Sequence, residues 1–466
     1  MTDAEKIPTS RVRRTATVGR LAASEAMKQF GTRAANLTRG DRAAEDALAR
    51  RQLETAKQIV GVLGTMKGAA MKLGQVMSFL DVGLVPEEFR DEFQHELAKL
   101  RDAAPAVSFK QMRKVIENDL GEPLRNVFAS FDEEPIAAAS IGQVYRATLR
   151  ESKRQVAVKV QYPGVAAAVR ADVQNLDMIM RLLKRMTPQL DVKAIAAEVR
   201  DRIVEELDYE LEAQNQRSLH RIYRGHPFIV VPEVIGELTR ERVLVTELVD
   251  GVGFEDFKKR PQAQRDRIGE IVFRFFFGCL YRHRQFSGDP HPGNFLLLGD
   301  GRVAFLDFGL FKRMDVPAVE LELACQRAVC EQDAPALHEL LGASGFLPHP
   351  ERVDPQHLLA YVEDAIWWYT ADEVVELKPE IATQVLIESS DPRSTHFREM
   401  RHQDMRPEHL FGRRMEMLTL AVLSQLNATA NWHRIAREWM YGDEPVTDLG
   451  REEAEFYGHA GVRTTG

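Results

Sequence analysis

The chain has 466 residues, of which 44% are hydrophobic and 28% charged, and its formal net charge is −8 at pH 7. This composition is typical of a globular protein with a sizeable core, and the acidic balance argues against a nucleic-acid-binding protein, which usually carries a basic surplus. The cysteines show neither a disulfide framework nor metal-ligand spacing, so we expect small, buried or partly buried residues in a reducing cytoplasm: Cys279, Cys325 and Cys330.

Residues 1–50 are polar, alanine-rich and locally basic, with four arginines between positions 11 and 20. They contain no apolar segment of the signal-peptide kind, and we expect a partly ordered leader. A basic amphipathic helix that lies on an anionic membrane surface remains open as the alternative.

No stretch of the chain approaches the roughly 20 apolar residues that a membrane-spanning helix needs. The most apolar run, residues 271–280, is short and interrupted by Arg274, and it predicts a buried core helix. We therefore expect a cytoplasmic protein whose contact with a membrane, if it has one, is peripheral.

Helical periodicity begins at about residue 51, where apolar residues recur at three- and four-residue spacing. Residues 107–118 predict a further helix that ends near Gly121. We expect residues 51–130 to form a helical extension in front of the remaining chain.

Residues 131–250 combine strand and helix patterns. A polar turn between the first two predicted strands indicates a hairpin, and a long helical region is predicted for residues 165–223. The predicted strands are residues 144–149, 156–160, 229–231 and 243–247. We expect this region to form a small, β-rich lobe with inserted helices.

Residues 251–466 are predicted to be mainly helical, apart from one hairpin in which residues 295–298 and 303–306 flank a Gly-Asp-Gly turn. This region holds all four tryptophans, which we expect to pack its core: Trp367, Trp368, Trp432 and Trp439. The order of these three regions along the chain predicts an α+β, bilobal protein-kinase-like fold with a helical N-terminal extension and an α-rich C-terminal lobe.

The strongest chemical signal is the segment Asp289-Pro-His-Pro-Gly-Asn294, followed after the predicted hairpin by Asp307-Phe-Gly. Its two prolines exclude a helix, and the hairpin returns Asp307 toward the same end of the lobe. Phosphoryl transfer from ATP needs metal ions that neutralise phosphate charge and a group that orients the nucleophile. We predict Asn294 and Asp307 as Mg²⁺ ligands and Asp289 as base or orienting carboxylate. Turn-capping Asp and Asn residues are the structural alternative.

Lys159 stands in the middle of an apolar strand, where a charge is costly unless it has partners. We predict that it contacts ATP phosphates and that Glu212 is its carboxylate partner, while a lysine reaching into solvent is the alternative. The strand 243–247 runs into an acidic turn of the kind expected at a hinge between lobes. Backbone groups at Glu247 and Val249 are predicted to bind the adenine.

The segment in front of the lysine strand is rich in alanine, whereas a phosphate-covering loop normally carries several glycines. One glycine remains, so we expect a stiffer loop whose phosphate contacts differ. The nucleotide-binding residues predicted in this loop are Ala137, Ala138, Ala139, Ser140, Gly142 and Gln143.

With these residues assembled, the chain resembles the UbiB/AarF/ADCK family of atypical protein-kinase-like proteins over roughly residues 55 to 315. The resemblance rests on the alanine-rich loop and on three further motifs: Lys72-Leu-Gly-Gln75, Lys159-Val-Gln-Tyr-Pro-Gly-Val165 and Glu206-Leu-Asp208.

The resemblance implies that Lys72 and Gln75 lie over the nucleotide pocket and block peptide substrates. Lys72 would then lie near Glu206 and Asp208. The family is implicated in isoprenoid quinone and lipid homeostasis, with ATPase or small-molecule kinase activity favoured over protein phosphorylation. It often has His two residues before the catalytic Asp, where this chain has Ser287, so the anchoring of the loop is expected to differ.

Three functions are compatible with these residues. The first is an Mg-ATP-dependent ATPase or kinase that acts on a lipid or quinone-pathway molecule, and the intact carboxylates favour it. The second is a nucleotide-gated scaffold with little catalysis, which the stiff loop favours. The third is a phosphotransferase of the aminoglycoside-kinase type, because Gly288-Asp-Pro-His-Pro-Gly-Asn294 also resembles the loop of those enzymes.

Overall fold

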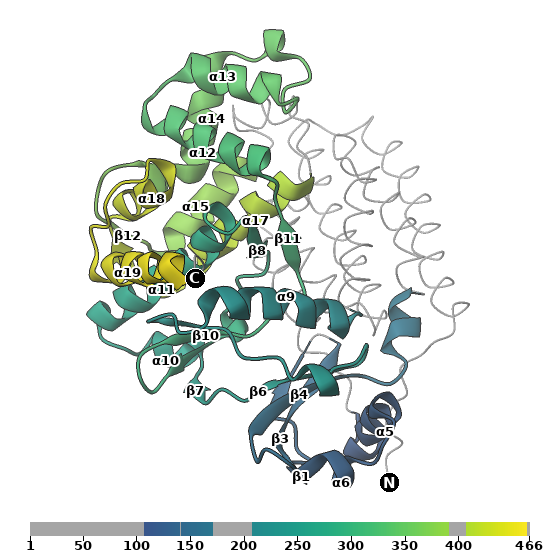
Figure 1. Ribbon diagram of the computed structural model, residues 1–466. Coiled ribbons are helices and arrows are strands. Elements are labelled where there is room, and N and C mark those ends of the chain that lie inside the picture. Colours follow the sequence, from purple (N-terminus) through teal and green to yellow (C-terminus); the bar gives the residue numbers. More distant parts are fainter. Residues whose placement is uncertain (1–106, 140, 171–206, 391–406, 464–466) are drawn as a thin grey trace, which may run out of the picture. The chain divides into compact units, whose positions relative to one another are not determined.

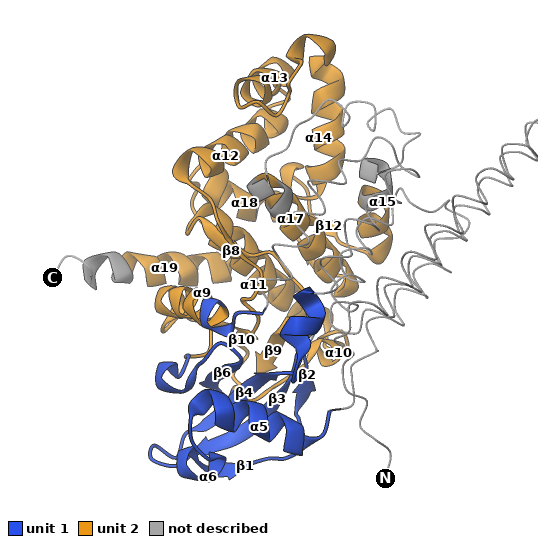
Figure 2. Ribbon diagram, turned by 90° about the vertical axis from the view of Figure 1, so that its right-hand side faces the viewer, with its two compact units in different colours: residues 1–211, 234–248 blue, residues 212–233, 249–466 orange. Residues whose placement is uncertain are grey.

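The computed structural model describes residues 107–139, 141–170, 207–390 and 407–463 (Figure 1). Compactness divides the chain into two units: unit 1 takes residues up to 211 and residues 234–248, and unit 2 takes residues 212–233 and 249–466 (Figure 2). The leader, the helices expected within residues 51–100 and the middle of the helical region 165–223 lie outside the described residues.

Unit 1 is built on a five-stranded antiparallel sheet with the order β1-β3-β4-β6, in which β2 also pairs with β3. The predicted hairpin is present as β3 and β4, which pair over most of their length because their alternating apolar residues share one face. The strands are β1 (Phe128–Phe131), β2 (Ala137–Ala138), β3 (Gly142–Leu149), β4 (Gln155–Gln161) and β6 (Val243–Glu247).

The helix predicted for residues 107–118 is α5 (Phe109–Leu120), which is followed by the short α6 (Leu124–Val127). The side chain of Gln111 accepts a hydrogen bond from the backbone N–H of Ser108 at 3.3 Å, which satisfies one donor at the start of α5. Gly121 ends the helix with φ 78°, a left-handed conformation that favours glycine. Both ends of this helix therefore follow from local sequence.

The helical region 165–223 is not one helix. Residues 165–170 are helical, but Leu207 and Asp208 are not, and α9 (Tyr209–Tyr223) begins after them. Asp208 Oδ1 accepts hydrogen bonds from the backbone N–H groups of Glu210 and Leu211, both at 3.0 Å. This capping favours a helix start at Tyr209, so the predicted helical region contains a break before α9.

Unit 2 contains a four-stranded sheet with the order β5-β10-β9-β7, in which β5 and β10 are parallel. The predicted hairpin is β9 and β10. The expectation of a single hairpin after residue 251 is wrong, because β8 pairs with β11 and β12 pairs with β13, each over only two or three residues. The strands are β5 (Ile229–Val230), β7 (Gly251–Val252), β8 (Gln285–Ser287), β9 (Phe295–Leu298), β10 (Val303–Phe305), β11 (Phe311–Arg313), β12 (Val375–Glu376) and β13 (Thr429–Ala430).

Helices make up most of unit 2, and they pack around α11, which is buried from Ile271 to Tyr281. Trp368 and Trp432 are fully buried against Phe273 of α11, and Trp367 and Trp439 are partly buried in the same core, as predicted. The helices are α10 (Phe254–Phe257), α11 (Gln262–Tyr281), α12 (Val316–Cys330), α13 (Ala334–Ala343), α14 (Pro355–Thr370), α15 (Pro379–Ser390), α17 (Pro407–Gln425), α18 (Trp432–Met440) and α19 (Asp448–Arg463).

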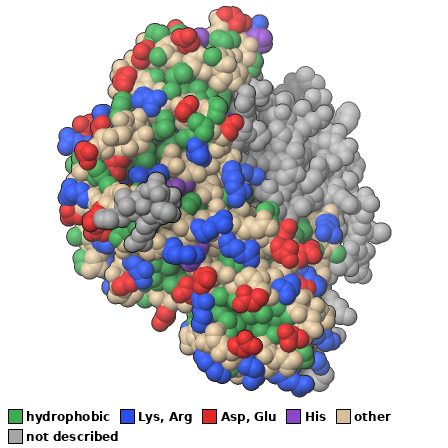
Figure 3. All heavy atoms as spheres, in the orientation of Figure 1, with side chains coloured by type: hydrophobic (Ala, Val, Ile, Leu, Met, Phe, Trp, Pro, Cys, Tyr) green, Lys and Arg blue, Asp and Glu red, His purple; other side chains and the backbone are tan. Residues whose placement is uncertain are grey.

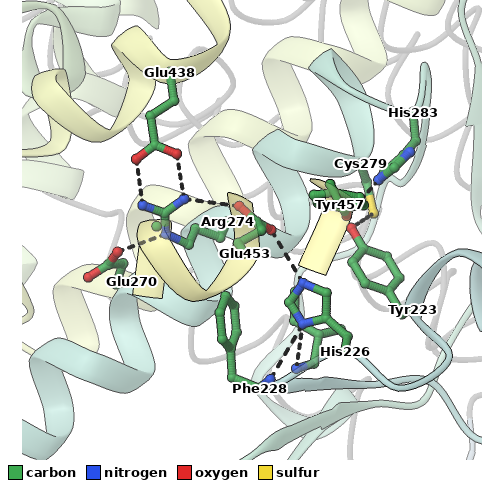
Figure 4. Close-up of polar contacts among 12 residues, drawn as sticks. Tyr223, His226, Phe228, Glu270, Arg274, Cys279, His283, Glu438, Glu453 and Tyr457 are labelled. Atoms are coloured by element: carbon green, nitrogen blue, oxygen red, sulfur yellow. Dashed lines mark hydrogen bonds and ion pairs between the residues drawn. The ribbon is translucent and has the colours of Figure 1, made fainter. Parts of the chain in front are cut away.

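The charge that interrupts α11 lies fully inside unit 2. Arg274 is 0% exposed, and its guanidinium contacts Glu270 at 2.7 Å, Glu438 at 2.7 Å and Glu453 at 3.0 Å (Figure 4). A buried cation needs such partners, because an unpaired charge in a core is strongly destabilising. The Arg274 cluster, defined by these four residues, thus ties α11 to α18 and α19.

Within the described ranges, no helix is both long and apolar enough to cross a membrane. Cys279 and Cys325 are buried, Cys330 is partly buried, and all three thiols are free, as predicted. Burial raises the pKa of the Cys279 and Cys325 thiols to about 12, so neither is a reactive thiolate at neutral pH.

Candidate nucleotide site

The loop that carries Asp289 begins directly after β8 in unit 2. Gly288 donates its backbone N–H to the carbonyl oxygen of Leu310 at 2.8 Å, which fixes the start of the loop against the chain that follows Asp307-Phe308-Gly309. The Asp289 side chain is partly buried. The short β8–β11 pairing therefore brings the two acidic motifs together from positions well separated in sequence.

The loop is also tied to itself through the backbone carbonyl of Asp289. This oxygen accepts hydrogen bonds from the backbone N–H of His291 at 2.7 Å and from Nδ2 of Asn294 at 3.2 Å. His291 Nδ1 in turn accepts the backbone N–H of Gly293 at 3.1 Å. Polar side chains and two prolines thus hold a segment with no regular strand or long helix in one conformation.

The predicted metal ligands Asn294 and Asp307 flank the β9–β10 hairpin at the same end. Phe295 pairs with Phe305, and Leu306 donates its N–H to the carbonyl oxygen of Asn294 at 2.9 Å. Because Nδ2 of Asn294 is engaged with the loop, the amide oxygen is the atom that this side chain offers to a cation. An amide oxygen and a carboxylate are hard ligands that suit Mg²⁺.

The described part of the chain holds no group of three or more His, Cys, Asp and Glu side chains arranged to bind a metal ion. A Mg²⁺ site of the kind predicted does not need one, since Mg²⁺ takes one or two protein ligands and completes its shell with phosphates and water. The residues Asn294 and Asp307 at this hairpin therefore suit Mg²⁺ as ligands.

The Asp307-Phe308-Gly309 segment is held from three sides. Phe308 is fully buried in the core, and its carbonyl oxygen accepts a hydrogen bond from Nδ2 of the buried Asn215 on α9 at 3.2 Å. Oδ1 of Asp307 accepts the N–H of Gly309 at 2.9 Å, and its carbonyl oxygen accepts the Ser287 hydroxyl at 3.4 Å. The orientation of Asp307 is thereby set by groups from α9, β8 and its own turn.

Glu212 lies on α9 and is 4% exposed. A side chain added at Gly309 would meet it, because an ideal Cβ there lies 3.7 Å from Oε2 of Glu212 and 3.4 Å from Oδ1 of Asp307. The carboxylates of Glu212 and Asp307 thus both lie next to Gly309, within unit 2.

An arginine from the C-terminal helices also reaches the loop. Nη2 of Arg414, on α17, lies 3.8 Å from Oδ1 of Asp289, and the two side chains are 13% and 14% exposed. Motif reasoning did not single out this arginine, because no spacing rule links a helix near residue 414 to a loop at 289.

Lys159 occupies the centre of β4 in unit 1, paired with Val144 of β3 and Leu244 of β6. Val156, Val158 and Val160 are 0% exposed, and strand alternation places Lys159 on the opposite face. Its Nζ lies 5.1 Å from the ring centroid of Tyr209, within cation–π range. Lys159 is therefore a partly buried cation beside an aromatic ring, and its contacts with phosphate and with Glu212 remain predictions.

The alanine-rich segment forms a tight hairpin in unit 1. β2 pairs with β3, and Ala139 donates its N–H to the carbonyl oxygen of Gly142 at 2.9 Å. An ideal Cβ at Gly142 would lie 2.1 Å from the carbonyl oxygen of Val160, so no side chain fits there. The remaining glycine is thus explained by the close passage of β4.

The string that begins at Lys159 also has a structural explanation. Nε2 of Gln161, which is 1% exposed, donates to the carbonyl oxygen of Leu207 at 2.8 Å and ties β4 to the start of α9. Gly164 has φ 79° and lets the chain turn after the strand, before Val165 starts the next helical residues.

The remaining predicted residues fall as follows. Glu247 ends β6 in unit 1, and Val249 begins the second part of unit 2, so a unit boundary falls within the predicted hinge. Lys72, Gln75, Ser140 and Glu206 lie outside the described residues, so the contact of Lys72 with Glu206 and Asp208 stays a prediction.

Comparison with known proteins identifies the group to which this geometry belongs. The family described as the ABC1 atypical kinase-like domain matches residues 99–341. A Mycobacterium tuberculosis structure, the complex of Rv3197 with erythromycin, superposes with a TM-score of 0.61 at 30% identity and covers 85% of this chain and 98% of that one. The chain belongs to the UbiB/AarF/ADCK family of atypical kinases. The predicted α+β kinase-like fold is confirmed with it.

Curated relatives of this family show the same match. The mitochondrial atypical kinase coq-8 of Caenorhabditis elegans is 31% identical over 354 residues, which cover 73% of this chain and 46% of that protein. The chloroplastic protein ACTIVITY OF BC1 COMPLEX KINASE 1 of Arabidopsis thaliana is 34% identical over 54% of this chain and 37% of its own length. Mitochondrial COQ8B of Rattus norvegicus is 31% identical over 70% of this chain and 62% of its own length. The chain spans about half the length of the curated relatives it matches.

Ser287 stands at the position where the sequence led us to expect a difference in loop anchoring. Its hydroxyl donates to the backbone carbonyl of Asp307 at 3.4 Å and so connects the two acidic motifs. The sequence predicted a difference in anchoring. It did not reveal Asn215, whose contribution depends on the packing of α9 against Phe308.

Proposed function

We propose that this chain binds Mg-ATP and transfers the γ-phosphoryl group to water or to a small molecule, as an atypical ATPase or kinase, rather than phosphorylating proteins. The observation that supports it most is the fixed set of Asp289, Asn294 and Asp307 on two hydrogen-bonded segments of unit 2. Phosphoryl transfer relies on positioning and electrostatics more than on covalent help from the protein, and these residues are suited to both tasks.

In the proposed reaction, the oxygen of water or of an acceptor hydroxyl bonds to the γ-phosphorus while the bond from that phosphorus to the β–γ bridging oxygen breaks, which releases ADP. The proton of the attacking oxygen passes to the Asp289 carboxylate. Asn294 and Asp307 would hold Mg²⁺, which when bound neutralises charge on the phosphates. Lys159 would contact phosphate oxygens.

We further propose that the phosphate acceptor belongs to isoprenoid quinone or lipid metabolism. Family membership and the names of the COQ8 relatives support this assignment. The surface of unit 2 is compatible with a peripheral lipid contact: Figure 3 shows Lys and Arg side chains gathered over α9 and the β8–β11 pair. The partly or fully exposed lysines and arginines of these elements and of the turn before β8 are Arg217, Arg221, Arg282, Arg284, Lys312 and Arg313. Such a surface attracts anionic headgroups.

The test is ATP turnover by the full chain with Mg²⁺, with and without anionic liposomes. Asp307→Asn is expected to lower turnover by roughly 100-fold or more, because it removes a charge directed at the transferring group. Asp300→Asn is the matched control, since Asp300 is an exposed aspartate in the turn at the opposite end of the same hairpin. Nucleotide binding without turnover under either condition would reject the enzyme.

That outcome would favour the second candidate, a nucleotide-gated scaffold. The hydrogen-bonded alanine hairpin supports this candidate, because it offers less freedom to close over phosphates than a glycine-rich loop.

A third candidate, a phosphotransferase that modifies antibiotics, draws support from the relative solved with erythromycin. Transfer of phosphate to erythromycin or to an aminoglycoside by the purified chain would decide for it.

A further inference from the structure

Arg414 and Asp289 form a close pair of opposite charges within unit 2. Nη2 of Arg414 lies 3.8 Å from Oδ1 of Asp289, beyond direct hydrogen-bond distance but well within the range of charge attraction. Both side chains are largely shielded, at 13% and 14% exposure, so water screens this attraction less than at a surface pair.

The position of Arg414 is set by the residue before it. Arg413 forms ion pairs with Glu322 of α12 at 2.8 Å and with Glu416 of its own helix at 2.9 Å. Glu416 also accepts the hydroxyl of Tyr281, at the end of α11, at 3.0 Å. These buried contacts hold this part of α17 against two other helices, and so they fix the point from which Arg414 reaches the loop.

The hydrogen bonds within the loop act on a different atom of Asp289. They hold its backbone carbonyl, through His291 and Asn294. The Arg414 guanidinium faces the carboxylate itself, which is the group that must point at the attacking oxygen. The loop bonds therefore fix where Asp289 stands, and Arg414 can bias where its carboxylate points.

We propose that Arg414 is a positioning residue for the Asp289 carboxylate, so that the α-rich C-terminal helices contribute directly to the reaction. This proposal rests on the function proposed above. Misplacement of a reacting group by an ångström lowers turnover by roughly 10²-fold. Loss of Arg414 should thus reduce kcat and leave the KM for ATP within about two-fold, because Asp289 serves the chemical step and not the binding of nucleotide.

The experiment compares Arg414→Gln, Arg414→Lys and Arg414→Ala with the full wild-type chain. We expect about a 10- to 100-fold loss of kcat for Arg414→Gln, a smaller loss for Arg414→Lys, and partial recovery of Arg414→Ala when guanidinium ion is added. Arg434→Gln is the matched control, because Arg434 pairs with Asp372 on an exposed surface, and its turnover should stay unchanged. An unchanged kcat in Arg414→Gln overturns the proposal. So does a loss of kcat that matches the loss of folded protein, if guanidinium ion does not rescue Arg414→Ala.

A second measurement tests the coupling of Arg414 to Asp289 without relying on turnover. It still applies if the wild-type chain does not hydrolyse ATP, a result that would reject the proposed function separately. Thermal unfolding of Arg414→Gln, Asp289→Asn and the double variant forms a cycle that reports the coupling of the two side chains. If Arg414 acts on the Asp289 carboxylate, the double variant loses less in Tm than the two single losses combined. Strictly additive losses show that the pair is not coupled and reject the positioning role.

Discussion

Unit 2 contains two groups of shielded charge that are built in different ways. In the Arg274 cluster, one guanidinium is contacted by three carboxylates within 3.0 Å, all from helices (Figure 4). In the Asp289 loop, hydrogen bonds from His291 and Asn294 hold the backbone carbonyl of Asp289, and Nη2 of Arg414 lies 3.8 Å from Oδ1 of its carboxylate. The first arrangement pairs a buried cation directly with carboxylates, whereas the second fixes the backbone of a loop, and the carboxylate and amide residues predicted as ligands lie at one end of a hairpin. The contrast separates charge that serves folding from charge that, under the proposed function, faces a ligand.

Arg274→Met should give the largest loss of stability. It removes the cation and leaves three carboxylates in a core without it, which costs about 3–5 kcal/mol in unfolding free energy. Urea unfolding measures this loss, and Arg434→Met, at an exposed pair, should cost at most about 1 kcal/mol. Turnover per folded molecule should be unchanged. Equal losses of unfolding free energy for the two variants would mean that the ion pairs of the Arg274 cluster contribute no more to stability than an exposed ion pair does.

Asn215→Ala should have an intermediate effect that touches both stability and activity. The carbonyl oxygen of buried Phe308 loses its side-chain donor, and an unsatisfied buried group costs about 1–3 kcal/mol. Because the same carbonyl belongs to the segment of Asp307, turnover should also fall. Gln214→Ala is the control, since Gln214 is exposed on the same helix. A loss of stability with wild-type turnover would show that Asn215 serves the core alone.

The effect that is absent at neutral pH and appears only on acidification is expected from His283. Burial, assisted by the Arg282 cation, lowers the pKa of His283 from 6.5 to about 4, so the folded chain takes up a proton less readily than the unfolded chain does. Stability from this group is therefore present above pH 6.5 and is lost as the pH falls from 6.5 toward 4. His283→Gln should flatten that part of the stability profile, measured by urea unfolding. Some slope should remain, because burial also lowers the pKa of His226 beside the Arg274 cluster. An unchanged slope in His283→Gln contradicts the assignment.

The regions that could be predicted from sequence are those with a local cause. The period of two in residues 156–160 correctly predicted the strand that carries Lys159, and Gly121 marked the end of α5. The two acidic motifs flanking a hairpin indicated that Asn294 and Asp307 would lie at the same end of it, which the pairing of Phe295 with Phe305 bears out.

What could not be predicted depends on contacts between distant segments. Strands β8 and β11 are three residues long, too short for alternation to be visible. Asn215 and Arg414 act on partners far along the chain, and a sequence holds no spacing rule for such packing. The place where α9 begins depends on capping by Asp208, which competes with helical periodicity and wins locally.

The alanine hairpin of unit 1 also bears on how this family can change over time. Ala137 and Ala138 are exposed, so exchanging them for glycine or for a larger residue alters the flexibility of the hairpin without disturbing the core. Gly142 has no such latitude, because any side chain there would collide with the backbone of β4. Substitutions at Ala137 and Ala138 can therefore change the flexibility of one arm without loss of fold, while position 142 in the other arm accepts glycine alone.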